Sequence, residues 1–509
     1  YLLSPFNVIL LLFDTVDLPL GLWIVTILKL SCCGLTMYLF LARSFEQNRK
    51  DFLLFSTSYA VMGYNVAQMQ NIMWIDAVIL LPLVALGIKN YVKKKKFGLF
   101  VLSLAAAVAI NFYTGYMLCL FSAIYLLAEV ALDSEQFVFK KIFKKYFGGL
   151  FYIVLAVMMS GFSLLPVYYE ISGSRMKESS LRSTFYMLKN LDSRMWELGN
   201  KLCIGTYNVH QLKSGLPNIY AGCLCFVLFI LFFVSRKYKV SKKEKIIYVI
   251  TCVVLLLSFV SVGVNMIWHG FAQANGSPYR YSFFVSFLMI EIASRQYLKI
   301  QEGQEMVRKK DAAELVNIGI AAILGAFLLY KGFVQYKIDE SDYLNLSQIL
   351  LTVGFILVWF VLLKLRKSHK MMIGTYKSYC MLFFLIIELG LNMGIDISHF
   401  SYEKIGEYQA YVQETESVLK QIRKLDADPF YRIENDIRYE QRNCNDAMLL
   451  GYPSITHYSS VLPYSVSKYA SEEGMSSYPG SLSVVYKKEE ANAEAAGRNG
   501  IKYLITKSL

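Results

Sequence analysis

Long apolar runs separated by short charged connections constrain this sequence more than any other feature. Twelve runs are long enough, or nearly so, to cross the roughly 30 Å apolar layer of a bilayer as helices. They lie near 20–43, 51–65, 75–92, 97–111, 115–132, 146–168, 219–235, 246–264, 282–298, 315–331, 345–363 and 376–394. Hydrophobic residues make up 55% of the chain, more than a soluble core usually holds. The sequence therefore predicts a mainly α-helical, polytopic transmembrane bundle of about 12 spans.

Basic residues mark every second connection between these runs. The six basic connections carry 28 lysines and arginines, whereas the short connections between them carry three, Arg280, Lys331 and Lys337. Cytoplasmic loops are enriched in Lys and Arg, so both ends of the sequence are predicted to face outward. A first span usually follows a cytoplasmic N-terminus, and we therefore expect one further helix and part of an outer loop before Tyr1. The net charge of +14 lies in short clusters, which favours a membrane surface over nucleic acid.

Two predicted outward segments are long enough to carry structure of their own. One is the loop 169–218, which is rich in lysine and arginine: these charges suit lipid phosphates, an anionic polymer or an ordinary solvated face. The other follows Asp396 and begins with an amphipathic helical pattern near 401–424, followed by predicted strands in FYRIE and IKYLIT. We predict a transmembrane domain at 1–396 and a small extracytoplasmic α+β domain at 397–509.

Ionisable residues within the apolar runs are the first candidates for chemistry, because a charge buried in hydrocarbon needs a partner or a cavity. Four residues qualify, Lys29, Asp76, Glu291 and Glu388. Asp76 opens its run on the predicted outer side and is the candidate catalytic carboxylate, although an acid there also suits a helix N-terminus. The other three fit pairing between helices or snorkelling to an interface.

Polar and aromatic residues also interrupt the apolar pattern on the predicted outer side. Asn71 and Trp74 precede Asp76, and the block NFYTGY supplies Asn111, Tyr113 and Tyr116. Such residues either anchor a helix at the membrane interface or form the wall of a carbohydrate site, where rings stack and amides bond hydroxyls.

The outer loop at 268–283 combines several polar groups in one short connection. Arg280 is its only basic residue, and a guanidinium binds phosphate through a planar fork, so donor phosphate binding is one reading and a structural salt bridge the other. His269 is a second candidate for binding the donor phosphate, and its alternatives are a general base and a structural hydrogen-bonding residue. Asn275 and Tyr279 are candidates for binding the sugar or the acceptor. No nucleotide-binding or zinc-hydrolase motif occurs at a suitable place.

Seven sequence blocks resemble the bacterial YfhO membrane proteins, which are classed with the GT-C glycosyltransferases. The blocks are SPFNVILLLF (4–13), SYAVMGYN (58–65), NIMWIDAVILLPLVALG (71–87), NFYTGYMLC (111–119), GLPNIYAG (215–222), HGF with SPYRYSFFVSF (269–287) and NDAMLLGYPSITHYSS (445–460). The resemblance implies a GT-C-like fold in a multi-pass protein of the cell membrane.

The resemblance also implies an activity, the transfer of a sugar from a polyprenyl-phosphate donor to an anionic cell-wall polymer such as lipoteichoic acid of a Gram-positive bacterium. GT-C enzymes use an acid in their first outer loop, and most of that loop is expected before Tyr1. Some relatives use a divalent metal, but no carboxylate pair here demands one. Two alternatives stay open: a flippase or transporter of lipid-linked sugars, and a non-catalytic partner that presents substrate to another enzyme.

Overall fold

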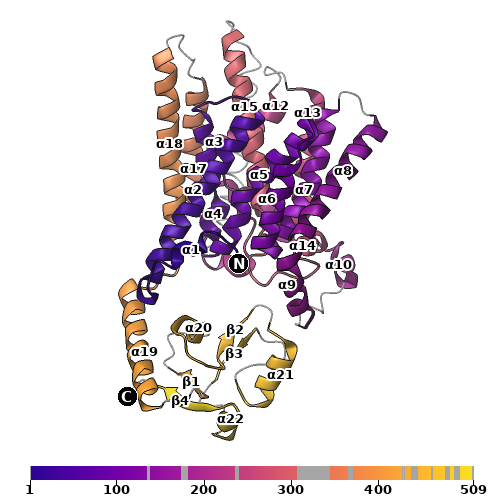
Figure 1. The fold of residues 1–509 in the computed structure, drawn as a ribbon. Coiled ribbons are helices and arrows are strands. Elements are labelled where there is room, and N and C mark those ends of the chain that lie inside the picture. The colour runs from indigo at the N-terminus through magenta and orange to yellow at the C-terminus, as the bar shows by residue number, and fades with distance from the viewer. Residues whose placement is uncertain are drawn as a thin grey trace. The chain divides into compact units, whose positions relative to one another are not determined.

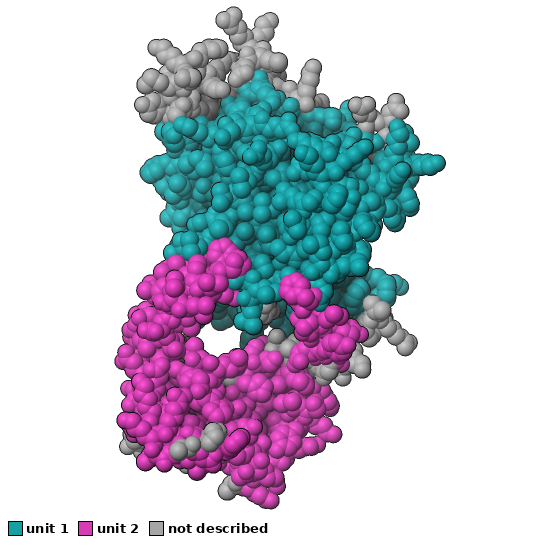
Figure 2. Space-filling view, in the orientation of Figure 1, with its two compact units in different colours: residues 1–4, 26–161, 181–401 teal, residues 5–25, 162–180, 402–509 magenta. Residues whose placement is uncertain are grey.

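The computed structural model describes residues 2–134, 138–173, 181–235, 240–306, 344–364, 371–426, 428, 430–436, 445–459, 462–475, 482–486 and 493–506. The chain divides into two compact units, shown in teal and magenta in Figure 2. Unit 1 comprises Tyr1–Ser4, Thr26–Gly161 and Leu181–Ser401, and unit 2 comprises Pro5–Val25, Phe162–Ser180 and Tyr402–Leu509. The predicted boundary between residues 396 and 397 stays a prediction.

Unit 1 is a bundle of helices that run roughly side by side (Figure 1). Helix α5 is largely buried and packs against α6 and α7, while α12 packs against α15 and α17. The helices are α2 (Leu18–Ser44, in this unit from Thr26), α3 (Phe52–Ala60), α4 (Gly63–Gln68), α5 (Ile72–Lys94), α6 (Gly98–Ile110), α7 (Phe112–Asp133), α8 (Phe139–Met159), α10 (Leu181–Met187), η3 (Ser193–Leu202), α11 (Gln211–Ser214), α12 (Cys223–Val234), α13 (Lys242–Val260), α14 (Val262–Trp268), α15 (Phe283–Met306), α17 (Leu346–Lys364) and α18 (Met371–Ser398).

Helices occupy eleven of the twelve predicted runs, and the run at 315–331 lies outside the described residues. Among the described residues, six helices are long and apolar enough to cross a membrane: Thr15–Ser44, Ile72–Lys94, Phe112–Asp133, Phe139–Met159, Leu346–Leu363 and Ser378–Ser398. Helices α6 and α12 are apolar but shorter. A membrane-embedded helical protein is therefore supported, whereas the count of twelve spans stays a prediction.

Polar side chains stand at three breaks between consecutive helices, and two of these breaks each divide a single predicted span. Asn111 separates α6 from α7, and its side chain accepts hydrogen bonds from the backbone N–H groups of Tyr113 and Thr114. Ser261 separates α13 from α14 in the same way by accepting from Val264. The run at 146–168 is interrupted at Ser160, whose hydroxyl bonds the Ala105 carbonyl at 2.9 Å. Asn111 and Ser261 thus cap the helix after the break, whereas Ser160 connects its break to α6.

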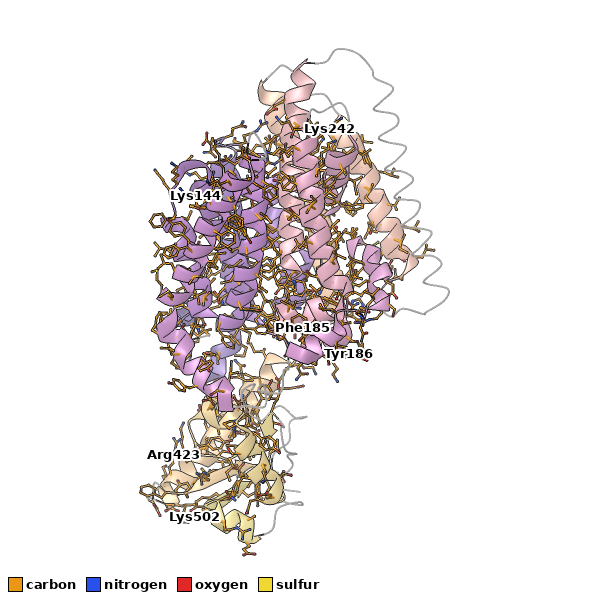
Figure 3. All side chains as sticks on the ribbon, turned by 90° about the vertical axis from the view of Figure 1, so that its right-hand side faces the viewer. Lys144, Phe185, Tyr186, Lys242, Arg423 and Lys502 are labelled. Carbon is orange, nitrogen blue, oxygen red and sulfur yellow. The ribbon has the colours of Figure 1, made fainter. Side chains whose placement is uncertain are left out.

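The described parts of the basic connections lie at one end of unit 1. Lys94 pairs with Glu46 at 2.9 Å, which joins the connection after α5 to the connection after α2. Lys243 donates to the Leu132 carbonyl at 3.1 Å, which joins the start of α13 to the end of α7. Figure 3 shows Lys144 and Lys242 towards this end of the unit and Phe185 and Tyr186 at the other. The alternation of charge thus corresponds to two chemically different ends, and the assignment of the basic end to the cytoplasm stays a prediction.

Unit 2 contains the predicted amphipathic helix and both predicted strands. Val412, Leu419 and Ile422 on α19 pack against Ile433 and Ile505 of the paired strands β1 and β4, which run parallel. A second pair, β2 and β3, is antiparallel. The elements are α1 (Asn7–Leu10), η1 (Thr15–Asp17), α9 (Gly161–Gly173), α19 (Ile405–Leu425), β1 (Arg432–Asn435), α20 (Asp446–Leu450), β2 (His457–Tyr458), α21 (Tyr464–Glu472), β3 (Ser483–Val484), α22 (Ala493–Arg498) and β4 (Ile501–Ile505).

Two glycines at the contact of α5 with α6 provide a test of this packing. A Cβ added at Gly87 would lie 2.4 Å from the Phe100 nitrogen, whereas one added at Gly98 meets nothing within 4 Å. We expect Gly87→Ala to lower the free energy of unfolding by about 1 to 3 kcal/mol, because α6 has to move away. Gly98→Ala is the matched control and is expected to be neutral or slightly stabilising. Thermal unfolding in detergent measures both, and equal melting temperatures would contradict the close approach.

Candidate functional site

The loop between α14 and α15 forms the centre of the candidate site, at the end of unit 1 opposite the basic connections. Its backbone takes left-handed conformations at Gly270, Phe271, Gly276 and Ser277, where φ is +68°, +67°, +73° and +42°. Two of these residues carry side chains, for which such angles are unfavourable. Ser277 donates its backbone N–H to the Leu212 carbonyl at 2.5 Å, which ties the loop to α11. Strain held in place by packing is typical of functional loops.

Arg280 is held between aromatic rings. Its guanidinium carbon lies 4.6 Å from the centre of the Trp74 ring and 5.1 Å from that of Tyr113. Its Nη2 donates to the backbone carbonyls of Asn275 at 2.8 Å and Gly276 at 3.0 Å. These contacts fix the side chain and leave the Nε–H, which is buried, without a hydrogen-bond partner.

No carboxylate neutralises Arg280 in the part of the chain that the structure describes. The ion pairs found there involve other residues, so the salt-bridge reading of this arginine has no support. A cation that is aromatic-walled and lacks a carboxylate partner attracts an anion, and a guanidinium offers several N–H donors to a phosphate. The arrangement can bind a phosphate group.

His269 lies beside this cation as a neutral imidazole. Its Nε2–H donates to the Pro278 carbonyl at 2.7 Å, so its Nδ1 accepts from the Tyr113 hydroxyl. Burial, helped by the charge of Arg280, lowers the pKa of His269 to about 4 from an ordinary value of 6.5. Both ring nitrogens are used within the protein, and the histidine therefore orients Tyr113 and the loop.

Tyr279 is anchored by an ion pair that the sequence did not reveal. Its hydroxyl donates to Asp192 at 2.7 Å, and the same carboxylate accepts from Arg194 at 2.7 and 3.0 Å. Hydrogen bonds from Arg194 hold the pKa of Asp192 at about 2 despite partial burial. Arg194 and Asp192 were visible in the sequence only as charges of a long loop, because nothing in their spacing pointed to Tyr279.

Lys201, another charge of this loop, is buried and not solvated. Its Nζ donates to the Thr206 carbonyl at 2.5 Å and to the side chains of Gln211 and Asn218. Burial lowers the pKa of Lys201 to about 7. This lysine holds the loop together, so it belongs neither to a solvated face nor to the charges of this loop that could bind a lipid phosphate. Arg175 and Lys177 of the same loop lie outside the described residues.

Three further predicted site residues make contacts within the scaffold. The Asn111 amide donates to the Met73 carbonyl at 2.9 Å while its oxygen caps α7. The Tyr116 hydroxyl donates to the Ile267 carbonyl at 2.9 Å, and Asn71 donates to Gln68 at 3.0 Å. These contacts connect α5, α7 and α14 around Arg280. Asn275 is exposed at the loop tip.

Asp76 forms a buried ion pair. Its carboxylate accepts from Lys29 at 2.8 Å and from the Ser4 hydroxyl at 3.0 Å, and the side chains of Lys29 and Asp76 are 1% and 4% exposed. Residues two apart on a helix point in nearly opposite directions. Trp74 faces Arg280, so Asp76 points away from that cation and towards α2. Its predicted catalytic role is untested, and its contacts are those of a structural ion pair.

The other two acids predicted within the apolar runs, Glu291 and Glu388, are also buried and well partnered. Glu291 accepts from Lys89 at 2.6 Å and from the Tyr125 hydroxyl at 2.9 Å. Glu388 accepts from the Tyr220 hydroxyl at 2.6 Å and from the Trp359 indole at 2.5 Å. The described residues hold no cluster of His, Cys, Asp and Glu that could bind a metal ion.

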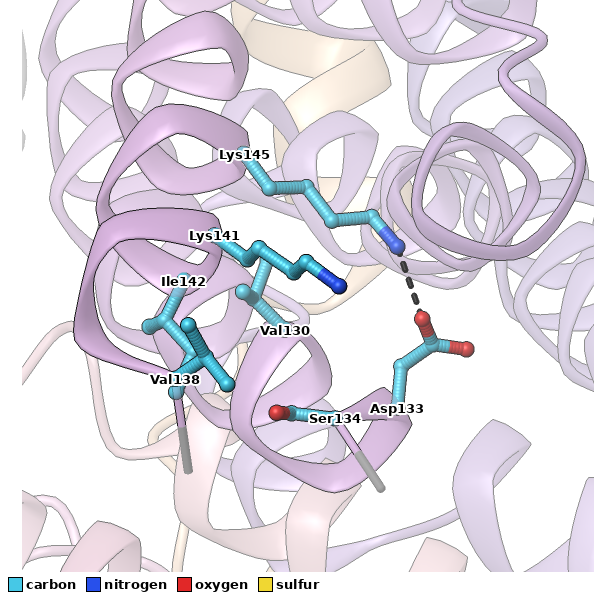
Figure 4. Close-up of a pocket in the computed structure, with 7 residues that line it drawn as sticks. All are labelled: Val130, Asp133, Ser134, Val138, Lys141, Ile142 and Lys145. Atoms are coloured by element: carbon cyan, nitrogen blue, oxygen red, sulfur yellow. Dashed lines mark hydrogen bonds and ion pairs between the residues drawn. The ribbon is translucent and has the colours of Figure 1, made fainter. Parts of the chain in front are cut away.

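A separate pocket lies at the basic end of unit 1, between α7 and α8. Figure 4 shows its lining and the ion pair of Lys145 with Asp133 at 2.7 Å. Its volume is about 370 Å³, and it is lined by Val130, Asp133, Ser134, Val138, Lys141, Ile142 and Lys145. None of the predicted site residues contributes to it.

Sequence reasoning missed Tyr64, which lies on α4 inside an apolar run. Its ring packs on Phe283 with centroids 5.0 Å apart, and its buried hydroxyl has no hydrogen-bond partner. The only signal was its place in the block SYAVMGYN, which is too apolar around this residue to suggest a site.

Comparison with known proteins places the whole chain in one family. The sequence model of the family described as bacterial membrane protein YfhO matches residues 1–507. Comparisons with curated proteins and with solved structures gave no match.

The neutral state of His269 predicts a pH dependence of stability. Its pKa is about 4 in the folded protein and near 6.5 when unfolded, so only the unfolded chain binds this proton between those values. We expect stability to fall as the pH drops from 6.5 to 4, by roughly 3 kcal/mol at most. Melting temperatures across this range should fall less steeply for His269→Gln. An unchanged slope would contradict a buried neutral imidazole.

The pair of Lys29 and Asp76 predicts a pattern of rescue. Asp76→Asn leaves a buried ammonium unpaired and is expected to cost about 3 to 5 kcal/mol of stability, and Lys29→Gln a similar amount. The double variant carries no buried charge at this position and should recover most of the loss. Thermal unfolding of the four proteins forms a double-mutant cycle, in which additive effects would rule out the ion pair.

Proposed function

The chain belongs to the family of the bacterial membrane protein YfhO, and from that premise we propose that it is a membrane glycosyltransferase. It moves a sugar from a polyprenyl-phosphate donor to an anionic cell-wall polymer such as lipoteichoic acid, on the outer face of the cell membrane. The observation that carries the proposal is Arg280, an aromatic-walled cation without a carboxylate partner among the described residues.

Arg280 suits the departure of a lipid phosphate. When the bond between sugar and phosphate breaks, negative charge grows on the phosphate oxygens, and a nearby fixed cation offsets it. The rings of Trp74 and Tyr113 and the carbonyls of Asn275 and Gly276 already position the guanidinium, so little reorganisation is needed during the reaction. In a weakly polar environment this interaction is stronger than in water.

The aromatic rings beside Arg280 also suit the sugar of the donor. Trp74 and Tyr113 are adjacent to the cation, and such rings stack on the apolar faces of sugars. Exposed Asn275 is in reach of groups that approach from outside the loop. In the proposal His269 and Tyr279 support this wall by holding Tyr113 and the loop.

Activation of the acceptor hydroxyl calls for a carboxylate within hydrogen-bond reach. Asp76 is the candidate within this sequence, and its pairing with Lys29 and Ser4 speaks against a free base.

The paired state of Asp76 favours a second candidate function, a non-catalytic partner that binds the lipid-linked sugar and presents it to another enzyme. The phosphate site would then be the same, but no sugar transfer would follow. Activity of the Lys29→Gln/Asp76→Asn double variant addresses the role of Asp76: full transfer removes this residue from catalysis.

Reconstitution of the full-length protein with labelled polyprenyl-phosphate sugars and cell-wall acceptors tests the proposal. We expect Arg280→Gln to lower the transfer rate by about 100-fold, because the departing phosphate loses its cation. Arg280→Lys keeps the charge but lacks the planar fork. Its transfer rate should therefore lie between those of the wild type and Arg280→Gln.

Lys93→Gln is the matched control, since it removes one positive charge from an exposed position at the basic end. Its rate should equal that of the wild type. Binding of the donor without transfer to any acceptor would favour the non-catalytic partner. Transfer that survives Arg280→Gln unchanged would exclude the proposed phosphate site.

A further inference from the structure

Two buried polar groups near the candidate site lack hydrogen-bond partners in the described structure. One is the Nε–H of Arg280 and the other is the hydroxyl of Tyr64, a residue that is 1% exposed. A buried polar group without a partner costs about 1 to 3 kcal/mol. Native proteins keep few such groups, and each calls for an explanation.

The two groups belong to one neighbourhood. The Tyr64 ring packs on Phe283, three residues after Arg280, with centroids 5.0 Å apart. Tyr64 also interacts electrostatically with Arg280 and with Tyr113, the ring that covers the guanidinium. The backbone beside Tyr64 is fixed, because the Gly63 N–H donates to the Tyr220 carbonyl at 2.8 Å.

A nearby tyrosine shows that this part of the bundle can satisfy a buried hydroxyl. Tyr59 is also fully buried, on α3, and its hydroxyl donates to the Val78 carbonyl at 2.7 Å. Tyr64 has no such carbonyl. A hydroxyl and a guanidinium N–H are both donors, so an anion that accepts from both would satisfy them together.

We infer that Tyr64 is a phosphate-binding residue of the Arg280 site, whose hydroxyl donates to the same phosphate group as the guanidinium. The inference rests on the proposed function and adds a donor that comes from α4. Both donor atoms are buried, so neighbouring side chains have to shift when a phosphate enters. The phosphate is that of a polyprenyl phosphate.

Binding of polyprenyl monophosphate to the full-length protein in nanodiscs tests the inference. Tyr64→Phe should raise the dissociation constant about tenfold, as expected for one hydrogen bond to a charged group. Its melting temperature should not fall, because the substitution removes an unsatisfied hydroxyl. Tyr59→Phe is the matched control and should show the reverse, a lower melting temperature and an unchanged dissociation constant.

Two further measurements separate the possible failures. If Arg280→Gln weakens binding and Tyr64→Phe does not, the inference about Tyr64 is wrong and the proposed function stands. If the wild type does not bind polyprenyl monophosphate, the proposed function itself fails. Inorganic phosphate should compete only at much higher concentration than the lipid, and equal affinity would overturn the assignment to a lipid phosphate.

Discussion

Buried polar groups in a helical bundle that lies in lipid have to find partners within the protein, because little water is present to solvate them. Lys29 and Asp76 meet this requirement by joining α2 to α5, and Lys89 and Glu291 by joining α5 to α15. Glu388 joins α18 to α17 through Trp359 and to the segment before α12 through Tyr220. Since the apolar faces of helices attract one another no more than they attract lipid, such polar contacts select which helices pack together. Removing one partner leaves a charge that the bundle cannot solvate.

The end of the bundle with Arg280 differs from these buried pairs, because its central charge is not paired with an opposite charge. Its supporting residues are fully partnered: Asp192 binds Tyr279, His269 binds Tyr113 and Pro278, and a strained loop backbone is tied down at Ser277. The cation that they surround is not neutralised by any described carboxylate. The supporting residues are held by hydrogen bonds, while donors at the centre of the site lack partners. A preorganised binding site requires this arrangement, because the site is then ordered during folding and not when the ligand binds.

The sequence predicted those features that depend on local pattern. Eleven of the apolar runs located helical segments, basic connections located one end of the bundle, and NFYTGY located the break between α6 and α7. It did not predict features that depend on distant partners. Lys29 lies 47 positions from Asp76, so no periodicity could show that the carboxylate is occupied. Lys201 looked like a surface charge because its acceptors come from a fold of the loop that composition does not reveal. Tyr64 was hidden in an apolar run, since only its packing against Phe283 brings it close to Arg280.

Charge balance around Arg280 connects the site with the kind of ligand proposed for it. His269 is neutral at physiological pH because burial lowers its pKa to about 4, and Asp192 is paired with Arg194, so neither changes the local charge. Arg280 then contributes a single positive charge. A phosphodiester that links a lipid to a sugar carries one negative charge and would leave the site neutral, whereas a second unpaired charge would be costly in a weakly polar environment.

As the sugar leaves, the phosphate gains further negative charge, and hydrogen bonds from the Tyr64 hydroxyl and the Arg280 Nε–H then stabilise it more than they stabilise the ground state. Interactions that strengthen in this way accelerate a reaction without tightening the binding of the substrate.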